Sequence, residues 1–221
     1  MKNYLVKVLK TELVTHNVKR FVVEKPDGYT FVPGQATDIA INKPGLENEL
    51  RPFTFTCLPS ADYLEFMIKM YTDHPGMTSH LPQVDAGDEL IVHEVFGTIH
   101  FEGDGLFIAG GAGITPFICI FRSLHEQLRL NGSTLLFANR TEDDVILKGE
   151  LKEMLGENYF DVIEIPKSGE AGRRIDRELL KRHLLPERQF CYVCGPDKFT
   201  AAMVETLIEI GVPRSKIIIE E

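Results

Sequence analysis

A glycine-rich turn in the middle of the chain has the residue types that hold a phosphate. The stretch 105–109 is apolar, and a helical pattern begins near Pro116. Glycines let a backbone turn tightly and approach a ligand, and a helix N-terminus presents free N–H groups to a pyrophosphate. The turn therefore predicts a dinucleotide site, although a tight strand-to-helix connection in any α/β domain also explains its glycines. Its candidate ligand-binding residues are Gly110, Gly111, Gly113, Ile114, Thr115 and Pro116.

Three arginines lie beyond this turn, where further strands of the same half are predicted to end. Arg140 directly follows one strand, and Arg173 and Arg174 lie between the next strand and its helix. A guanidinium at such a place suits a nucleotide phosphate, whereas an acid would suit a ribose. The alternative for Arg140 is a surface ion pair with Glu142 or Asp143. The choice between NADH and NADPH stays open.

The four cysteines, Cys57, Cys119, Cys191 and Cys194, raise the question of metal or redox chemistry. Cys191 and Cys194 have CxxC spacing, but the segment reads as a buried strand. Residues three apart on a strand face opposite sides and lie about 10 Å apart, beyond the reach of a disulfide. No second cysteine or histidine pair completes a zinc site. We expect neither a dithiol centre nor a metal at this pair.

The predicted elements that must position these groups fall into two halves with different patterns of secondary structure. Residues 1 to about 100 show short strands between turn residues, which is typical of an antiparallel barrel or sandwich. From Gly105 onward, strands alternate with helices, which indicates a doubly wound parallel sheet. We predict two domains, a six-stranded antiparallel β-barrel over residues 1–102 and a five-stranded parallel α/β domain over residues 103–221.

The predicted elements have definite limits in both halves. The first half has strands at Tyr4–Thr11, Val18–Val23, Ala36–Ile41, Phe53–Cys57, Tyr63–Tyr71 and Glu89–Val95, with one helical turn at Met77–Leu81. The second half has a strand before Gly110, then strands at Thr134–Ala138, Phe160–Pro166, Phe190–Cys194 and Lys216–Glu220. Its helices are predicted at Pro116–Leu130, Ile146–Leu155, Arg177–His183 and Phe199–Ile210.

Composition and charge exclude several classes of protein. The net charge is −9 and both halves carry more acids than bases, which argues against a nucleic-acid partner. No apolar run approaches the roughly 20 residues of a membrane span. Charges interrupt the apolar N-terminal stretch, which is unlike a signal peptide, so we expect a cytoplasmic protein.

Four ordered signatures make the chain resemble a known family. GxGxxP ends at Pro116, and Cys194, Gly195 and Pro196 follow a later strand. In the first half, Arg51–Thr54 reads Arg-Pro-Phe-Thr, and Pro75–Leu81 contains a glycine turn with Thr78, the glycine standing one place later than usual. Together these signatures resemble those of the ferredoxin–NADP reductase family over nearly the whole chain.

The resemblance implies that the first half binds FAD. Arg51 is expected on the pyrophosphate, Phe53 against the isoalloxazine ring, and Thr54 near the reactive flavin nitrogen. The short helix is expected to complete the pyrophosphate site. Without the family context, these are a strand-edge arginine, a core aromatic, a strand threonine and a capped helical turn. The implied flavin-side residues are Arg51, Pro52, Phe53, Thr54, Gly76, Met77 and Thr78.

The resemblance also implies roles at the nicotinamide. Cys194 is expected to orient the nicotinamide ring without acting as a nucleophile, and Gly195 and Pro196 leave room for the nucleotide. Thr115 is expected on the nicotinamide side of the nucleotide, or as the N-cap of the following helix. The terminal aromatic of plant-type members has no counterpart here, and Glu220 or Glu221 is expected near the flavin edge.

The resemblance thus implies a reductase that takes hydride from NADPH or NADH onto bound FAD. Thr54 and Cys194 are its expected catalytic residues. Because the sequence encodes no iron–sulfur or haem motif, we expect a separate electron acceptor such as ferredoxin, flavodoxin or another redox protein. Two alternatives stay open, a flavin reductase that uses free flavin as substrate and a non-catalytic regulatory subunit. We expect a monomer or a weak dimer.

Overall fold

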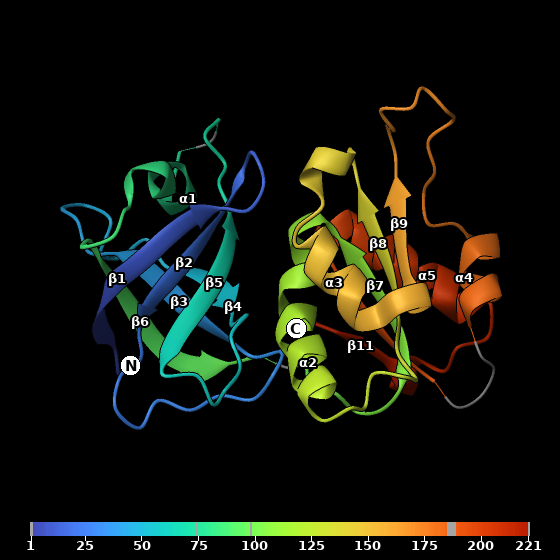
Figure 1. Cartoon of the computed structure of the whole chain (residues 1–221), viewed down its shortest axis with the longest axis horizontal. Coiled ribbons are helices and arrows are strands. Elements are labelled where there is room, and N and C mark those ends of the chain that lie inside the picture. The colour runs from blue at the N-terminus through green and yellow to red at the C-terminus, as the bar shows by residue number, and fades with distance from the viewer. Residues whose placement is uncertain (1, 74, 98, 185–188, 221) are drawn as a thin grey trace.

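The computed structural model describes residues 2–73, 75–97, 99–184 and 189–220. Its first half is a curled antiparallel sheet with the strand order β4-β3-β6-β1-β2-β5 (Figure 1). The edge strands β4 and β5 approach each other, so the sheet nearly closes and the predicted six-stranded barrel is confirmed. The elements are β1 (Tyr4–Leu13), β2 (Val18–Glu24), β3 (Ala36–Ile41), β4 (Arg51–Thr54), β5 (Tyr63–Lys69), α1 (Met77–His80), the 3-10 turn η1 (Leu81–Gln83) and β6 (Glu89–Phe96).

The barrel forms because its strands alternate between core and solvent. On β1, Val6 and Val8 are buried, whereas Leu5 and Lys7 are exposed. This two-residue period turns one face of the strand toward the core. The barrel core is rich in aromatic rings, and Phe55 is fully buried at its centre.

The second half is a five-stranded parallel sheet with the order β11-β10-β7-β8-β9, as predicted. One hydrophobic cluster joins the sheet to α2 and α3, and another joins its opposite face to α4 and α5. Helices on both faces bury a parallel sheet completely, and every residue of β7 is buried. The elements are β7 (Gly105–Gly110), η2 (Gly111–Ile114), α2 (Thr115–Glu126), β8 (Thr134–Asn139), η3 (Glu142–Asp144), α3 (Lys148–Leu155), η4 (Gly156–Asn158), β9 (Tyr159–Ile163), α4 (Arg177–His183), β10 (Phe190–Cys194), α5 (Asp197–Glu209), η5 (Arg214–Lys216) and β11 (Ile217–Ile219).

Several elements differ from the prediction at their ends. Strand β4 starts at Arg51 and ends at Thr54, because it pairs with β3 from Ile39 to Ala36 and then turns inward. Pro52 is compatible with this strand because β4 lies at the edge of the sheet.

Two helices of the second half are shorter than predicted because leucines with a left-handed backbone bound them. Helix α2 ends at Glu126, and Leu128 has φ 54°. Helix α3 begins at Lys148, directly after Leu147 with φ 49°. Glycine or asparagine usually occupies such positions, so neither limit was visible in the residue types.

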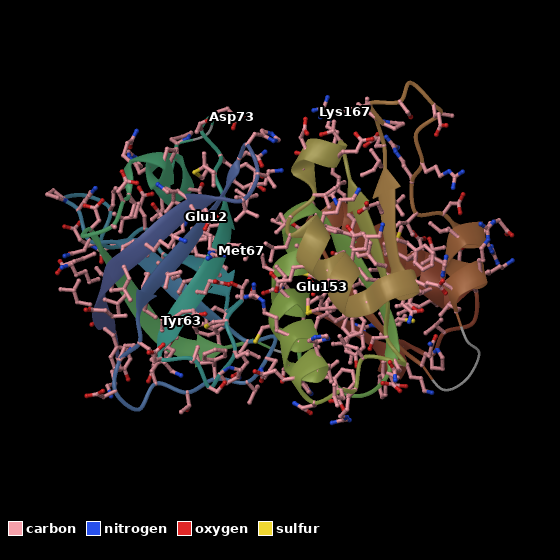
Figure 2. All side chains as sticks on the ribbon, viewed as in Figure 1. Glu12, Tyr63, Met67, Asp73, Glu153 and Lys167 are labelled. Atoms are coloured by element: carbon pink, nitrogen blue, oxygen red, sulfur yellow. The ribbon has the colours of Figure 1, made fainter. Side chains whose placement is uncertain are left out.

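The two halves are in direct contact through helix α2, which lies between the barrel and the parallel sheet (Figure 1). Cys119 of α2 belongs to the barrel's hydrophobic cluster, and Val18 and Met67 of the barrel belong to the cluster of the second half. Figure 2 shows Met67 on β5, on the side of the barrel that faces α2. Side chains from each half therefore complete the core of the other.

The segment before β7 is fastened to the second sheet. The Tyr192 hydroxyl accepts the N–H groups of Glu102 and Gly103 at 2.9 and 3.0 Å and donates to the Gly103 carbonyl at 2.8 Å. Burial raises the pKa of Tyr192 to about 12, so this hydroxyl keeps its proton. The predicted division at residues 102 and 103 falls in this segment and stays a prediction.

The placement of Cys191 and Cys194 agrees with the predicted strand geometry. All four cysteines are free and buried, and Cys191 and Cys194 belong to clusters on opposite faces of the sheet. The described residues contain no group of three or more metal-ligating side chains. Within the same residues, every helix is too short or too polar to cross a bilayer.

Candidate functional site

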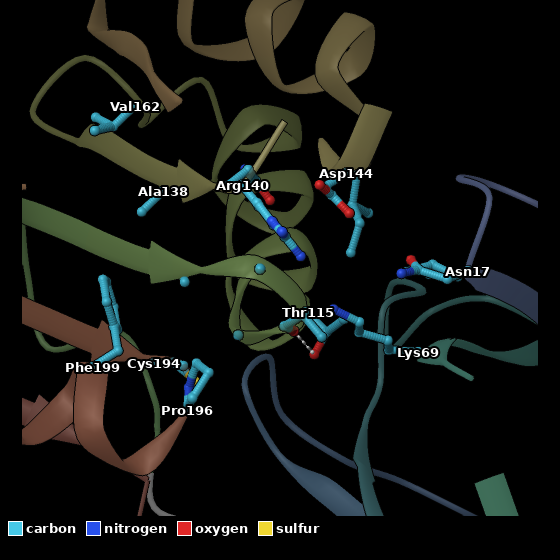
Figure 3. A pocket seen from close by; sticks show the side chains of 18 of the residues that line it. Asn17, Lys69, Thr115, Ala138, Arg140, Asp144, Val162, Cys194, Pro196 and Phe199 are labelled. Carbon is cyan, nitrogen blue, oxygen red and sulfur yellow. Dashed lines mark hydrogen bonds between the residues drawn. The ribbon is translucent and has the colours of Figure 1, made fainter. Parts of the chain in front are cut away.

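A cavity of about 1180 Å³ lies between the barrel and the carboxyl ends of the parallel strands. This edge of an open α/β sheet is where such folds bind ligands. Both halves contribute to the walls, and Figure 3 shows Lys69 and Asn17 of the barrel opposite Arg140 of the sheet. The predicted site residues that line the cavity are Pro52, Phe53, Thr54, Thr78, Gly110, Gly111, Gly113, Thr115, Pro116, Arg140, Arg173, Cys194, Gly195 and Pro196.

Four predicted residues lie outside the cavity walls. Met77 and Ile114 are fully buried in the hydrophobic clusters, so their side chains serve packing. The Arg51 side chain is exposed, and its Nη1 donates to the Leu50 carbonyl at 2.7 Å. Its Nη2 would lie 3.7 Å from a Cβ on Gly76. Arg51 and Gly76 are therefore neighbours on an outer edge of the barrel, and we call this pair the Arg51 edge.

The backbone of the Arg51 edge requires glycine. Gly76 has φ 137° and directly precedes the four-residue helix α1, which carries Thr78. A residue with a side chain rarely adopts this backbone conformation. The Glu49 Oε2 atom would lie 3.8 Å from a Cβ on Gly76 and has no hydrogen-bond partner among the described residues. The edge thus holds one exposed guanidinium beside one carboxylate.

A hydrogen bond between two threonines crosses the cavity floor from one half to the other. The Thr54 hydroxyl donates to the Thr115 hydroxyl at 2.7 Å, and Thr115 donates to the Ala112 carbonyl at 3.0 Å. Thr115 is the first residue of α2, and its hydroxyl makes no capping bond to the helix. The N-cap alternative for Thr115 is therefore wrong, because Ile114 occupies the N-cap position and Thr115 is already the first helical residue.

Gly111 and Gly113 of this turn are required for different physical reasons. A Cβ on Gly113 would clash with the Cys194 carbonyl and lie 2.5 Å from the Gly195 nitrogen. Gly111 has φ 53°, and a Cβ there would meet no atom within 4 Å. Gly113 is needed because the turn packs directly on the end of β10. Gly111 is needed for its backbone conformation and leaves open space beside it.

Cys194 is held at the end of β10 as a neutral thiol. Its side chain is 7% exposed, and its Sγ lies 3.7 Å from Glu220 Oε2. Burial raises the pKa of Cys194 well above its ordinary value, and the negative charge of Glu220 raises it further. Glu220 also lines the cavity, and its expected place near the flavin edge stays a prediction. Glu221 lies outside the described residues.

The arginines of the sheet edge differ in their partners. Lys167 takes up the two acids that were the alternative partners of Arg140: its backbone N–H donates to Glu142 at 3.1 Å and its Nζ to Asp143 at 2.6 Å. Arg140 instead extends from the end of β8 toward the cavity (Figure 3). Arg174 forms an ion pair with Glu164.

Sequence reasoning missed several residues of the walls. They come from turns, strand ends and two helices that carry no motif, and they are His16, Asn17, Lys69, Asp144, Glu164 and Phe199. The Phe199 ring would lie 2.9 Å from a Cβ on Gly110 and 2.7 Å from one on Gly195. The two glycines were visible in the sequence, but the sequence did not show that both face the Phe199 ring.

Comparisons with known proteins agree with this arrangement. The family model for the oxidoreductase NAD-binding domain matches residues 107–205. NADH–cytochrome b5 reductase 1 of Arabidopsis thaliana is 30% identical over 226 residues, covering 93% of this chain and 79% of that protein. A ferredoxin NADP+ reductase from Neisseria gonorrhoeae, solved with bound FAD and NADP, has a TM-score of 0.80 at 22% identity, covering 99% of this chain and 98% of that one. The cytochrome b5 reductase domain of Ulva prolifera nitrate reductase gives a TM-score of 0.80 at 21% identity, covering 99% and 97%.

Fold and site together define the class of two-domain reductases with the ferredoxin reductase-like fold, as the resemblance predicted. Within this class, the chain belongs to the NADH–cytochrome b5 reductase family. It is an NAD(P)H-dependent flavoprotein oxidoreductase, and the family uses FAD together with NAD(P)H.

Proposed function

We propose that this protein takes hydride from NADH onto bound FAD and passes the electrons to a separate redox protein. The observation that carries the proposal is the Thr54–Thr115 hydrogen bond of 2.7 Å in the floor of a cavity shared by both halves. It joins the expected flavin-side threonine to the expected nicotinamide-side turn. A cavity of about 1180 Å³ exceeds the usual range of single-ligand pockets and has room for two ligands that meet at this point.

The residues present fit FAD. Phe53 is half-buried and offers an aromatic face in the cavity wall, and Thr54 and Thr78 offer hydroxyls. The exposed Arg51 fork suits a pyrophosphate at the outer edge, where Gly76 leaves space for it. FAD, when bound, supplies a ring that accepts hydride and releases electrons singly or in pairs. The chain holds and orients this group with residues from β4 and α1.

The protein's own groups need no general acid or base for this reaction. Thr54 is buried, with 7% of the residue exposed, so its hydroxyl forms its hydrogen bonds in a site that is partly shielded from water. Cys194 stays protonated at working pH because burial raises its pKa, which agrees with a role in orienting the nicotinamide. Glu220 holds this thiol from the side of β11.

NADH is the proposed donor because the Arabidopsis thaliana relative named above carries NADH in its name. Arg140 and Arg173 are proposed to attract the nucleotide phosphates. Arg174 is already paired with Glu164, so one of the three candidate cations is largely neutralised.

The proposed acceptor is a small haem or iron–sulfur redox protein. Relatives are named for cytochrome b5, which makes a cytochrome of this kind the first candidate, with ferredoxin or flavodoxin as alternatives. We also propose that the protein acts in the cytoplasm as a monomer or weak dimer. The site residues and the division at residues 102 and 103 belong to the same proposal.

The test is a reduction assay on purified protein. We expect stoichiometric FAD, rapid bleaching of the flavin by NADH under anaerobic conditions, and slower bleaching by NADPH. Addition of ferricyanide and then of purified cytochrome b5 or ferredoxin identifies the acceptor. Colourless protein that reduces added free flavin would favour the flavin-reductase alternative. FAD-loaded protein that neither nucleotide reduces would contradict the proposal in favour of a regulatory subunit.

A further inference from the structure

Helix α2 contacts one short stretch of the barrel at three successive levels. Thr115, Cys119 and Arg122 are spaced by four and three residues, which places them on one face of the helix. All three form hydrogen bonds with residues 54–57, a stretch that begins at the last residue of β4. The contacts join Thr115 to the Thr54 hydroxyl at 2.7 Å, Cys119 Sγ to the Cys57 carbonyl at 2.9 Å, and Arg122 Nη1 to the Thr56 carbonyl at 2.7 Å.

Arg122 is the anchor of this series because carboxylates from both halves hold it. Its Nη1 donates to Glu65 of β5 at 2.6 Å, and its Nε and Nη2 donate to Glu150 of α3 at 2.5 and 3.0 Å. The Glu65 side chain is only 4% exposed and the Arg122 side chain 17%. Glu65 also accepts the Thr56 hydroxyl at 2.8 Å and lies 3.6 Å from Arg20 Nε.

The cluster is balanced in charge and rigid in geometry. Arg20 and Arg122 supply two cations, and Glu65 and Glu150 supply two anions. Burial opposes the charge of Arg122, but Glu150 and Glu65 outweigh it and raise the pKa of the guanidinium. A planar guanidinium holds several acceptors in fixed directions, which a lysine ammonium on a flexible chain does not. Arg122 therefore fixes the Thr56 carbonyl relative to both α2 and α3.

This fixed point is close to the redox centre of the proposed function. Thr56 is two residues from Thr54, about 7 Å along an extended chain. Arg122 is on the same helix as Thr115, whose own hydroxyl contacts Thr54. A shift of the barrel against α2 would therefore move Thr54 away from the glycine turn. A misplacement of about 1 Å between reacting groups costs about 100-fold in rate.

We propose that Arg122 is a positioning residue for hydride transfer: together with Glu65 it sets the spacing between the flavin-side strand and the nicotinamide-side turn. The inference rests on the proposed function and deepens it. It assigns to a residue outside the cavity walls the task of holding two ligand sites in register. A residue that merely stabilised the fold would change the melting temperature without changing the transfer rate in folded, FAD-loaded molecules.

The test compares Arg122→Lys with Arg182→Lys, a matched exchange of an exposed arginine on α4. For each variant, bound FAD per chain, melting temperature and the limiting rate of flavin bleaching by NADH in single turnover are measured. We expect Arg122→Lys to keep FAD within about twofold but to slow bleaching by about 10- to 100-fold, with half-saturation by NADH changed less than about threefold. Arg182→Lys is expected to match the wild type in all three measurements.

A second pair of variants approaches the cluster from the barrel. Glu65→Gln removes the buried partner charge, and Glu126→Gln removes an exposed charge from α2. Slower bleaching in Glu65→Gln, and not in Glu126→Gln, supports the proposal.

The proposal is overturned if FAD-loaded Arg122→Lys and Glu65→Gln bleach at the wild-type rate. Failure of both variants to bind FAD would also overturn it, because the cluster would then hold the fold together and not tune the site. A wild-type protein that NADH does not reduce would instead defeat the proposed function itself.

Discussion

The glycine-rich turn at residues 110–116 and the Arg51 edge both carry recognisable motifs, but the fold depends on the two regions to different degrees. In the turn, Gly113 packs against the backbone at Cys194, so the protein's own packing dictates the residue. At the Arg51 edge, the guanidinium is exposed and donates a hydrogen bond to the carbonyl of the neighbouring Leu50. Gly113 is therefore required by the protein's own packing, whereas the Arg51 guanidinium is expected to be required only when a ligand is present. Mutations should separate these two demands.

The largest expected effect is on the stability of the turn. Gly113→Ala forces a Cβ onto the Cys194 carbonyl, and overpacking of this kind costs about 3 kcal/mol of unfolding free energy. Gly111→Ala is the matched control, since its Cβ meets open space and only the left-handed backbone costs about 1 kcal/mol. Chemical denaturation of both variants measures the difference. Equal losses would show that Gly113 is not dictated by packing.

The next effect is on FAD binding at the Arg51 edge. Arg51→Ala is expected to weaken FAD by about 10- to 100-fold, because a charge-assisted hydrogen bond contributes about 1.5–3 kcal/mol. The stability of the FAD-free protein should not change, since the side chain is exposed. Flavin titration and thermal melting with and without FAD make the comparison, with Arg51→Lys as an intermediate. Full FAD occupancy in Arg51→Ala would show that the assignment of Arg51 is wrong.

A smaller effect is expected where the two regions meet. Thr54→Val removes the hydroxyl that contacts Thr115 and should slow flavin reduction by NADH about tenfold, while FAD stays bound. Thr54→Ser retains the hydroxyl and serves as the control. Stopped-flow bleaching of the flavin is the measurement. If Thr54→Val is as fast as the serine variant, the hydroxyl has no part in the transfer.

The smallest effect is expected at the cavity mouth. Arg140 is exposed, so Arg140→Ala should change half-saturation by NADH less than about threefold. The same change should raise half-saturation by NADPH about tenfold if Arg140 meets a 2′-phosphate. Steady-state assays with both nucleotides give the ratio. Equal losses for the two would place Arg140 on a phosphate that they share.

The sequence was sufficient for the architecture because each half has its own period. Short strands between turn residues predicted the barrel, and strands that alternate with helices predicted the parallel sheet. The limits of α2 and α3 were not predictable, since Leu128 and Leu147 adopt a conformation that leucine rarely takes.

The site was predictable only where a residue's chemistry was tied to a local motif. Thr54, Thr115 and Cys194 stand within such motifs and line the same cavity. Lys69 reaches the cavity from the barrel and only when the halves dock, whereas Phe199 reaches it from α5 once the second half has folded. The pairing of Arg122 with Glu65 likewise depends on the docked geometry, since 57 positions separate the two residues.

The position of α2 between the halves has a consequence for recombining such proteins. A chimera joined at residues 102 and 103 would respect the predicted domain boundary. It would nevertheless place Thr115, Cys119 and Arg122 against a foreign barrel. These three positions should be exchanged together with the barrel, although they lie after residue 103 in the chain. A functional graft should therefore transplant the barrel together with one face of a helix from the other half.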